Sequence, residues 1–164
     1  MAEDFEAFYD AATMGDRDAV EAMLTKHPRL VRASDENGFT ALHGLAGQDE
    51  PELAELLIDR GADVSAKNDM GMTPLHCASY GNIVEVLVRR GADVNARARN
   101  GWTPLHVQSQ EGEDTGALEV MEALLEAGAN PNLTDEKGNT PMAFAQQREE
   151  PEKVKLLRAH GARK

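Results

Sequence analysis

The chain has 164 residues, of which 17 are basic and 29 acidic, so its formal net charge is −12. This length favours a single domain, and a mean hydropathy of −0.51 without an apolar run of about 18 residues excludes a membrane-spanning helix. The negative charge repels phosphate groups, which argues against binding to nucleic acid or to a membrane surface. The single cysteine, Cys77, excludes an internal disulfide and a cysteine-rich metal site.

The N-terminus carries no sign of export. Residues 1–4 read Met-Ala-Glu-Asp, without the basic and apolar segments of a secretory signal peptide. We therefore expect a cytoplasmic protein. The high net charge and the polar ends of the chain also predict a monomer.

Two short phrases recur along the chain. The first reads Gly-Phe-Thr-Ala-Leu-His at 38–43, Gly-Met-Thr-Pro-Leu-His at 71–76, Gly-Trp-Thr-Pro-Leu-His at 101–106 and Gly-Asn-Thr-Pro-Met-Ala at 138–143. The second reads Gly-Ala-Asp-Val at 61–64, Gly-Ala-Asp-Val-Asn at 91–95, Gly-Ala-Asn-Pro-Asn at 128–132 and a truncated Gly-Ala at 161–162. The leading glycines are 33, 30 and 37 residues apart. Periods near 33 indicate stacked supersecondary units rather than one closed core.

These phrases resemble the ankyrin repeat, and the resemblance covers nearly the whole chain. It implies an all-α fold, an ankyrin-repeat solenoid of helix-turn-helix units with projecting β-hairpin loops. We expect one domain over residues 1–164 that contains five units. They are an N-terminal cap at 4–37, internal units at 38–70, 71–100 and 101–137, and a C-terminal cap at 138–164.

The same residues predict these helices on physical grounds. A threonine can cap the start of each first helix, and a proline suits the first helical position, where the missing N–H costs nothing. Apolar residues at helical spacing predict each second helix, and a glycine then ends it. The threonines are Thr40, Thr73, Thr103 and Thr140; the prolines are Pro74, Pro104 and Pro141; the glycines are Gly61, Gly91, Gly128 and Gly161.

Three departures from the repeat are local. Gly71 and Gly91 are 20 residues apart, against 23 for Gly38 and Gly61, which predicts a tight turn at 79–82 and a short second helix. Four extra residues in the next unit fall in a polar loop at 111–116. The last stretch, 148–164, holds six basic and three acidic residues. We expect a capping helix there with Lys153, Lys155 and Arg158 facing solvent; a basic docking tail is the alternative.

The recurrent histidines suggest a metal site at first, but their spacing argues against one. Metal ligands must lie about 2 Å from one ion, whereas stacked helices lie about 8–10 Å apart, so His43, His76 and His106 cannot converge. The resemblance implies instead that these imidazoles hydrogen-bond the backbone of neighbouring turns. The sequence contains no Gly-x-Ser-x-Gly, no phosphate-binding glycine loop and no His-Glu-x-x-His. We therefore predict no catalytic residue, metal or cofactor.

The candidate binding surface follows from the resemblance. In ankyrin proteins the hairpin tips and the exposed side of each first helix line a concave groove that contacts the partner. Carried over residue by residue, the partner-binding candidates here are Phe39, Met70, Met72, Tyr80, Arg97, Arg99 and Trp102. Three of them occupy one repeat position and predict an apolar stripe, with the arginines as a cationic spot beside it. Alternatively, Trp102 packs on the neighbouring hairpin and contributes to stacking.

The resulting functional hypothesis is a non-enzymatic module that binds a protein partner, as yet unidentified, through this concave surface. A narrower form is regulation or inhibition of one enzyme by covering its active site. The alternative is an exported, host-directed effector of ankyrin type, and an enzyme with a cryptic site is a third class.

Overall fold

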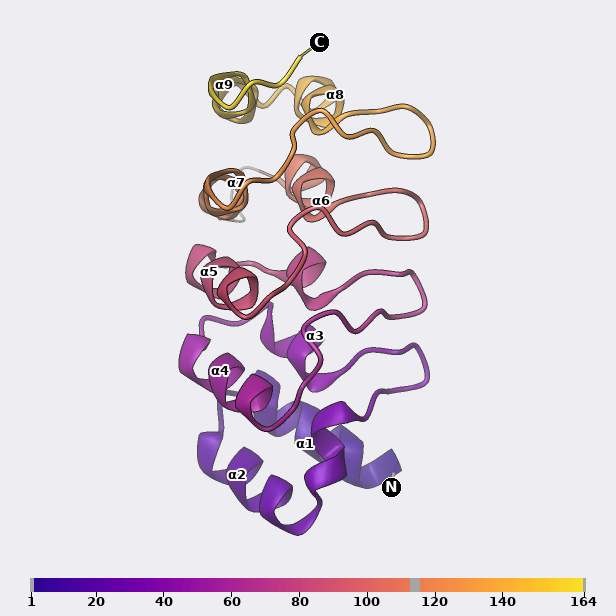
Figure 1. Ribbon diagram of the computed structural model, residues 1–164, viewed down its shortest axis with the longest axis vertical. Coiled ribbons are helices and arrows are strands. Elements are labelled where there is room, and N and C mark those ends of the chain that lie inside the picture. The colour runs from indigo at the N-terminus through magenta and orange to yellow at the C-terminus, as the bar shows by residue number, and fades with distance from the viewer. Residues whose placement is uncertain (1, 113–115, 164) are drawn as a thin grey trace.

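The computed structural model describes residues 2–112 and 116–163, and its helices stack in pairs along one direction (Figure 1). The elements in chain order are α1 (Ala2–Thr13), α2 (Arg17–Lys26), the 3-10 helix η1 (Pro28–Arg32), α3 (Ala41–Leu45), α4 (Pro51–Asp59), the 3-10 helix η2 (Pro74–Cys77), α5 (Gly81–Arg89), α6 (Pro104–Gln110), α7 (Ala117–Glu126), α8 (Pro141–Gln147) and α9 (Pro151–Ala159). The predicted all-α repeat fold is confirmed.

The connections that precede the first helices project together from one side of the stack (Figure 1). We call them the projecting loops and define them as residues 33–40, 66–73, 96–103 and 133–140. Across the described residues β-pairing is limited to one isolated antiparallel bridge between Ser34 and Thr40. In that part of the chain, no helix is both long and apolar enough to cross a membrane.

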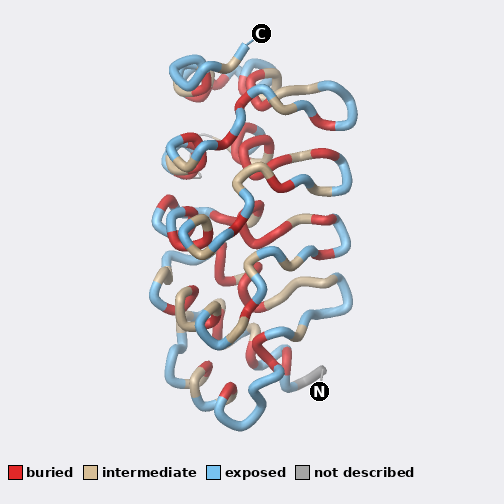
Figure 2. The backbone as a smooth tube through the Cα atoms, viewed as in Figure 1, coloured by how far each residue is buried: buried red, intermediate tan, exposed pale blue. Residues whose placement is uncertain are grey.

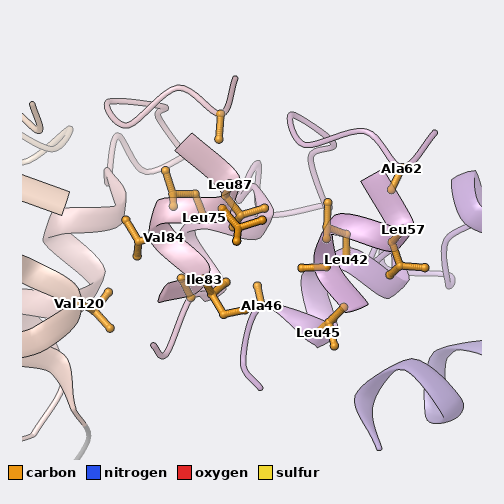
Figure 3. Close-up of a cluster of buried hydrophobic side chains, with 14 of the residues drawn as sticks. Leu42, Leu45, Ala46, Leu57, Ala62, Leu75, Ile83, Val84, Leu87 and Val120 are labelled. Carbon is orange, nitrogen blue, oxygen red and sulfur yellow. The ribbon is translucent and has the colours of Figure 1, made fainter. Parts of the chain in front are cut away.

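The apolar core is a continuous layer that runs the length of the stack. Buried residues follow its interior, whereas the loop tips and outer turns are exposed (Figure 2). Between the second and third units, Leu42, Leu57, Leu75 and Ile83 are at most 1% exposed and come from four different elements (Figure 3). Each unit therefore buries its apolar face only against its neighbours, as a solenoid requires.

The third unit corrects one expectation about helix length. The second helix, α5, has nine residues, as many as α4, so the prediction of a short second helix is wrong. The missing residues come from the first helix instead, which is reduced to the four-residue 3-10 turn η2. Burial explains this choice, because α5 contributes Ile83, Val84 and Leu87 to the core and could not lose a turn without leaving a cavity.

The C-terminal cap corrects a second expectation. Lys155 and Arg158 are exposed as predicted, but Lys153 is 1% exposed and does not face solvent. Its Nζ donates a hydrogen bond to the backbone oxygen of Gln108, at 3.1 Å, and another to that of Glu111. These carbonyls end α6, where the helix leaves its last acceptors without intrahelical donors.

The predicted loop at 111–116 lies partly outside the described residues, which omit 113–115.

Gly44 allows the first two units to approach closely. A Cβ atom added there would lie 2.6 Å from the Tyr9 ring and hydroxyl and 2.8 Å from Thr13 Cγ2. Although alanine is favoured over glycine in a helix by about 1 kcal/mol, we expect Gly44→Ala to lower the free energy of unfolding by about 1 kcal/mol, because overpacking outweighs that gain. Urea denaturation measures the difference.

Gly47→Ala is the matched control for this prediction. The nearest atom to its added Cβ is 3.5 Å away, an ordinary van der Waals contact. If the two variants had equal stability, the contact of Tyr9 with Gly44 would not be the constraint that we assign.

Candidate functional site

Three buried histidines connect successive projecting loops. In each, Nδ1 accepts a hydrogen bond from the backbone N–H of the threonine three residues earlier, so the ring proton lies on Nε2. Nε2 then donates to a carbonyl of the next projecting loop. These bonds run from His43 to Met72 O at 3.0 Å, from His76 to Trp102 O at 3.1 Å and from His106 to Asn139 O at 3.2 Å. The implied backbone role of the histidines is confirmed.

Burial determines the protonation of these rings. Desolvation lowers the pKa of His76 to about 4, although the bond to Trp102 O opposes the shift, and it also lowers the pKa values of His43 and His106. Burial raises the pKa of the neighbouring thiol, Cys77, to about 11. With both nitrogens of His76 bonded to backbone and the thiol protonated at neutral pH, this adjacent pair is not an activated nucleophile.

Backbone hydrogen bonds join the tips of the projecting loops into one row. Each runs from an N–H of one loop to a carbonyl of the loop before it, and each is 2.8–3.0 Å long. They are Asp69 N to Asn37 O, Arg99 N to Met70 O and Glu136 N to Asn100 O. The tip glycines permit this approach, since a Cβ atom on Gly71, whose φ is +75°, would lie 2.9 Å from Arg99 N. The tips therefore form a preorganised surface.

The structure brings most of the predicted binding residues onto this row. Met70 is 53% exposed, its carbonyl accepts from Arg99 N, and Arg97 and Arg99 are both exposed. Phe39 and Met72 are half-buried at the bases of their loops. Tyr80 lies apart from them: it is 39% exposed but precedes α5, at the opposite end of η2 from the projecting loop.

Trp102 packs on the next unit, on both its projecting loop and α8. Its ring makes an edge contact with Phe144 at a centroid distance of 5.3 Å, and its Nε1 donates to Asp135 Oδ2 at 3.2 Å. Burial tends to raise the pKa of Asp135, but hydrogen bonds from Asn139, Lys137 and Trp102 outweigh it and lower that pKa. Of the two expectations for Trp102, the structure therefore shows the contact with the neighbouring loop.

The loop that carries Trp102 departs from the other projecting loops at one sequence position. Position 98 is alanine, whereas the equivalent positions of the other loops hold Asp35, Asn68 and Asp135. Those side chains accept backbone N–H groups within their own loops. Ala98 has no side-chain acceptor, and in its loop Asn100 Oδ1 accepts a hydrogen bond from the backbone N–H of Trp102 at 3.0 Å. The indole N–H of Trp102 donates to Asp135 of the next loop.

We expect Trp102 and Asp135 to be energetically coupled. Trp102→Phe keeps a ring on Phe144 but removes the indole donor, and it should lower the free energy of unfolding by about 1 kcal/mol. In an Asp135→Ala background the same substitution should cost about 1 kcal/mol less. Urea denaturation of the four chains of this double-mutant cycle measures the coupling, and additive effects would contradict it.

Comparison with known proteins agrees with this geometry. Residues 8–98 and 96–164 match the family described as ankyrin repeats (3 copies). An ankyrin repeat protein of Pyrobaculum aerophilum is 42% identical over 77 residues, which are 47% of this chain and 28% of that protein. Alpha-latrocrustotoxin-Lt1a of Latrodectus tredecimguttatus is 35% identical over 68 residues, 42% of this chain and 5% of the toxin.

The NAD-capped RNA hydrolase NUDT12 of Homo sapiens is 33% identical over 73 residues, 44% of this chain and 16% of that enzyme. The aligned segments thus span less than a third of each of these three relatives. They share with this chain the repeats that make the loops and helices described above. Since the family match extends over nearly all of the described stack, the chain belongs to the ankyrin repeat family.

Proposed function

We propose that the stack, residues 1–164, acts as one non-enzymatic domain that binds a partner protein on the row of projecting loops. Ankyrin repeats are a non-catalytic fold that generally mediates protein–protein interaction. The observation that carries the proposal is the exposed Met70, held beside Arg99 by the backbone bond between their loops. An exposed apolar side chain with an arginine on the adjacent loop is typical of an interface anchor.

The charges of this region indicate the chemistry of the partner. Lys67, Arg97 and Arg99 are exposed on adjacent loops of a chain whose net charge is −12. Lys67 Nζ donates to Arg97 O at 3.3 Å, and Arg97 donates to Thr134 O at 2.6 Å, so each of the two side chains reaches across to the next loop. The partner presents an apolar knob with a nearby carboxylate. An enzyme covered at its active site is one such partner.

Phe39, Met72 and Trp102 have a supporting role in this proposal. Trp102 O and Met72 O accept the histidine bonds that fix the loops, and all three side chains are half-buried. Tyr80 is part of the proposed surface only for a partner that extends along the first helices, because it lies beyond η2.

Photocrosslinking tests the proposal. A benzophenone side chain at position 70 should capture one partner from lysate of the source cells, and the same group at position 14 should not. Met14 is the matched control, because it is 81% exposed but lies in the turn between α1 and α2. Arg99→Glu should weaken that capture about tenfold, whereas Arg60→Glu should leave it unchanged. Identical adducts from positions 70 and 14 would contradict the proposal.

A further inference from the structure

A separate groove lies at the N-terminal end of the stack, between α1 and the first projecting loop. Its volume is about 1140 Å³, and it is lined by α1, by the turn that joins α2 to η1, and by residues 33–36. The helix α1 has 12 residues, against five to seven for α3, α6 and α8, and its N-terminus extends towards the side of the loops (Figure 1). This longer helix forms one wall of the groove.

The floor of the groove is apolar and its position is fixed. Phe5 and Leu30 are each 7% exposed, and Tyr9 is half-buried at a ring distance of 6.0 Å from Phe5. The Tyr9 ring lies over Gly44, whose lack of a side chain makes room for it. The accessible face of Tyr9, held beside Phe5 and Gly44, therefore offers apolar area that does not need to rearrange before a ligand binds.

The two long walls of the groove are acidic. The α1 wall carries Asp4, Glu6 and Asp10, and the loop wall carries Asp35 and Glu36; all five are exposed. Tyr9, Asp10 and Asp35 line the same groove, and burial raises the pKa of the Tyr9 hydroxyl, which the charges of Asp35 and Asp10 raise further. The cationic lining residues Lys26 and Arg29 lie at the turn after α2.

We propose that this groove is a second docking site, which binds a basic amphipathic segment of a partner protein. Apolar side chains of the segment cover the Tyr9 ring and the remaining exposed edges of Phe5 and Leu30, and its lysines or arginines face the carboxylates of both walls. Charge complementarity selects this occupant: an acidic segment would be repelled by the exposed carboxylates of both walls, and an uncharged one would bring no counter-charge to Glu6, Asp10 and Glu36. The site is distinct from the surface around Met70 and Arg99, and it does not depend on the function proposed for that surface.

A synthetic peptide with a leucine pair flanked by lysines is the probe, and its binding is followed by fluorescence anisotropy and by shifts of backbone amide resonances. We expect shifts in α1 and residues 30–36, and binding about tenfold weaker for Asp10→Lys/Glu36→Lys. Glu122→Lys/Glu126→Lys is the matched control, since both residues are exposed on α7 and the change in net charge is the same. The control pair should retain most of the affinity.

Four outcomes would overturn the proposal. The first is equal weakening by both pairs, which would show diffuse attraction to an acidic protein. The second is the absence of binding, and the third is equal binding of a peptide in which glutamates replace the lysines. The fourth is self-association without peptide, seen by sedimentation and accompanied by concentration-dependent shifts of the amide resonances of the groove, which would assign the groove to a second copy of the chain. Crosslinking at position 70 tests only the proposed surface on the projecting loops, and the peptide titration tests only the groove. A negative result in one experiment therefore does not affect the other proposal.

Discussion

Replacing Lys153 by methionine is expected to lower the free energy of unfolding by about 2 kcal/mol. The side chain comes from α9, is 1% exposed, and donates to the carbonyls of Gln108 and Glu111 at the end of α6. Methionine keeps the apolar stem but not the donors. Each carbonyl left without a partner costs about 1–3 kcal/mol, offset in part because a buried charge is also removed. Urea denaturation followed by circular dichroism measures the change.

The same substitution should loosen the C-terminal cap. Gln108 links this region further, since its Nε2 donates to Ala78 O at 2.9 Å, so Lys153 ends a polar chain that runs from α9 to the third unit. Hydrogen exchange should become faster in α8 and α9 than in α3 and α4. Lys155→Met, on the exposed side of α9, is the control and should change stability by at most about 0.5 kcal/mol. Equal stability of the two variants would contradict the role of Lys153.

The second large effect is a loss of stability in mild acid that is caused by His76. An unfolded histidine binds its proton near pH 6.5, whereas His76 in the folded chain binds it near pH 4. Between these values the unfolded chain holds the extra proton, so the contribution of His76 to the free energy of unfolding decreases as pH falls, by about 1.4 kcal/mol per pH unit. The contribution of His76 is complete above pH 6.5, and about 3 kcal/mol of it is lost by pH 4.

His76→Ala isolates this effect, and the chain supplies a precedent because Ala143 occupies the equivalent position in the last unit. The cost of the substitution, measured by urea denaturation, should be about 2 kcal/mol smaller at pH 4.5 than at pH 6.5. His160→Ala is the control for removing an exposed imidazole. A cost of His76→Ala that is independent of pH would show that the buried ring is protonated as readily as in the unfolded chain. Asp135 does not interfere, because its lowered pKa affects stability only at more acidic pH.

Most of the fold could be predicted from the sequence because repeat geometry is local. The phrase that contains Thr73, Pro74 and His76 specifies a helix start by interactions within four residues, and the structure shows those bonds. The glycine at 71 likewise specifies a left-handed tip through its own backbone freedom. Because the same helix-start phrase and tip glycine recur in successive units, each copy supports the helix boundaries predicted for the others.

Less of the candidate surface could be predicted from the sequence. A family resemblance locates Met70 and Arg99 at a loop tip, but it does not tell whether a side chain at such a position points to solvent or to the next loop. The Met70 side chain is exposed to solvent, whereas the Trp102 indole donates a hydrogen bond to Asp135 of the next unit. The groove beside Tyr9 also went unpredicted, because it depends on how far α1 extends past the first projecting loop.

The sequence by itself determined the repeated unit, its helix starts and stops, and the histidines that join neighbouring loops. Only the tertiary structure decided which helix lost residues in the third unit, why Lys153 is buried, and which way Trp102 faces. The physical reason is the separation along the chain between the residues that interact. Capping and turn formation are settled among residues a few positions apart, whereas the burial of a side chain depends on partners that the fold brings from 33 to 45 residues away.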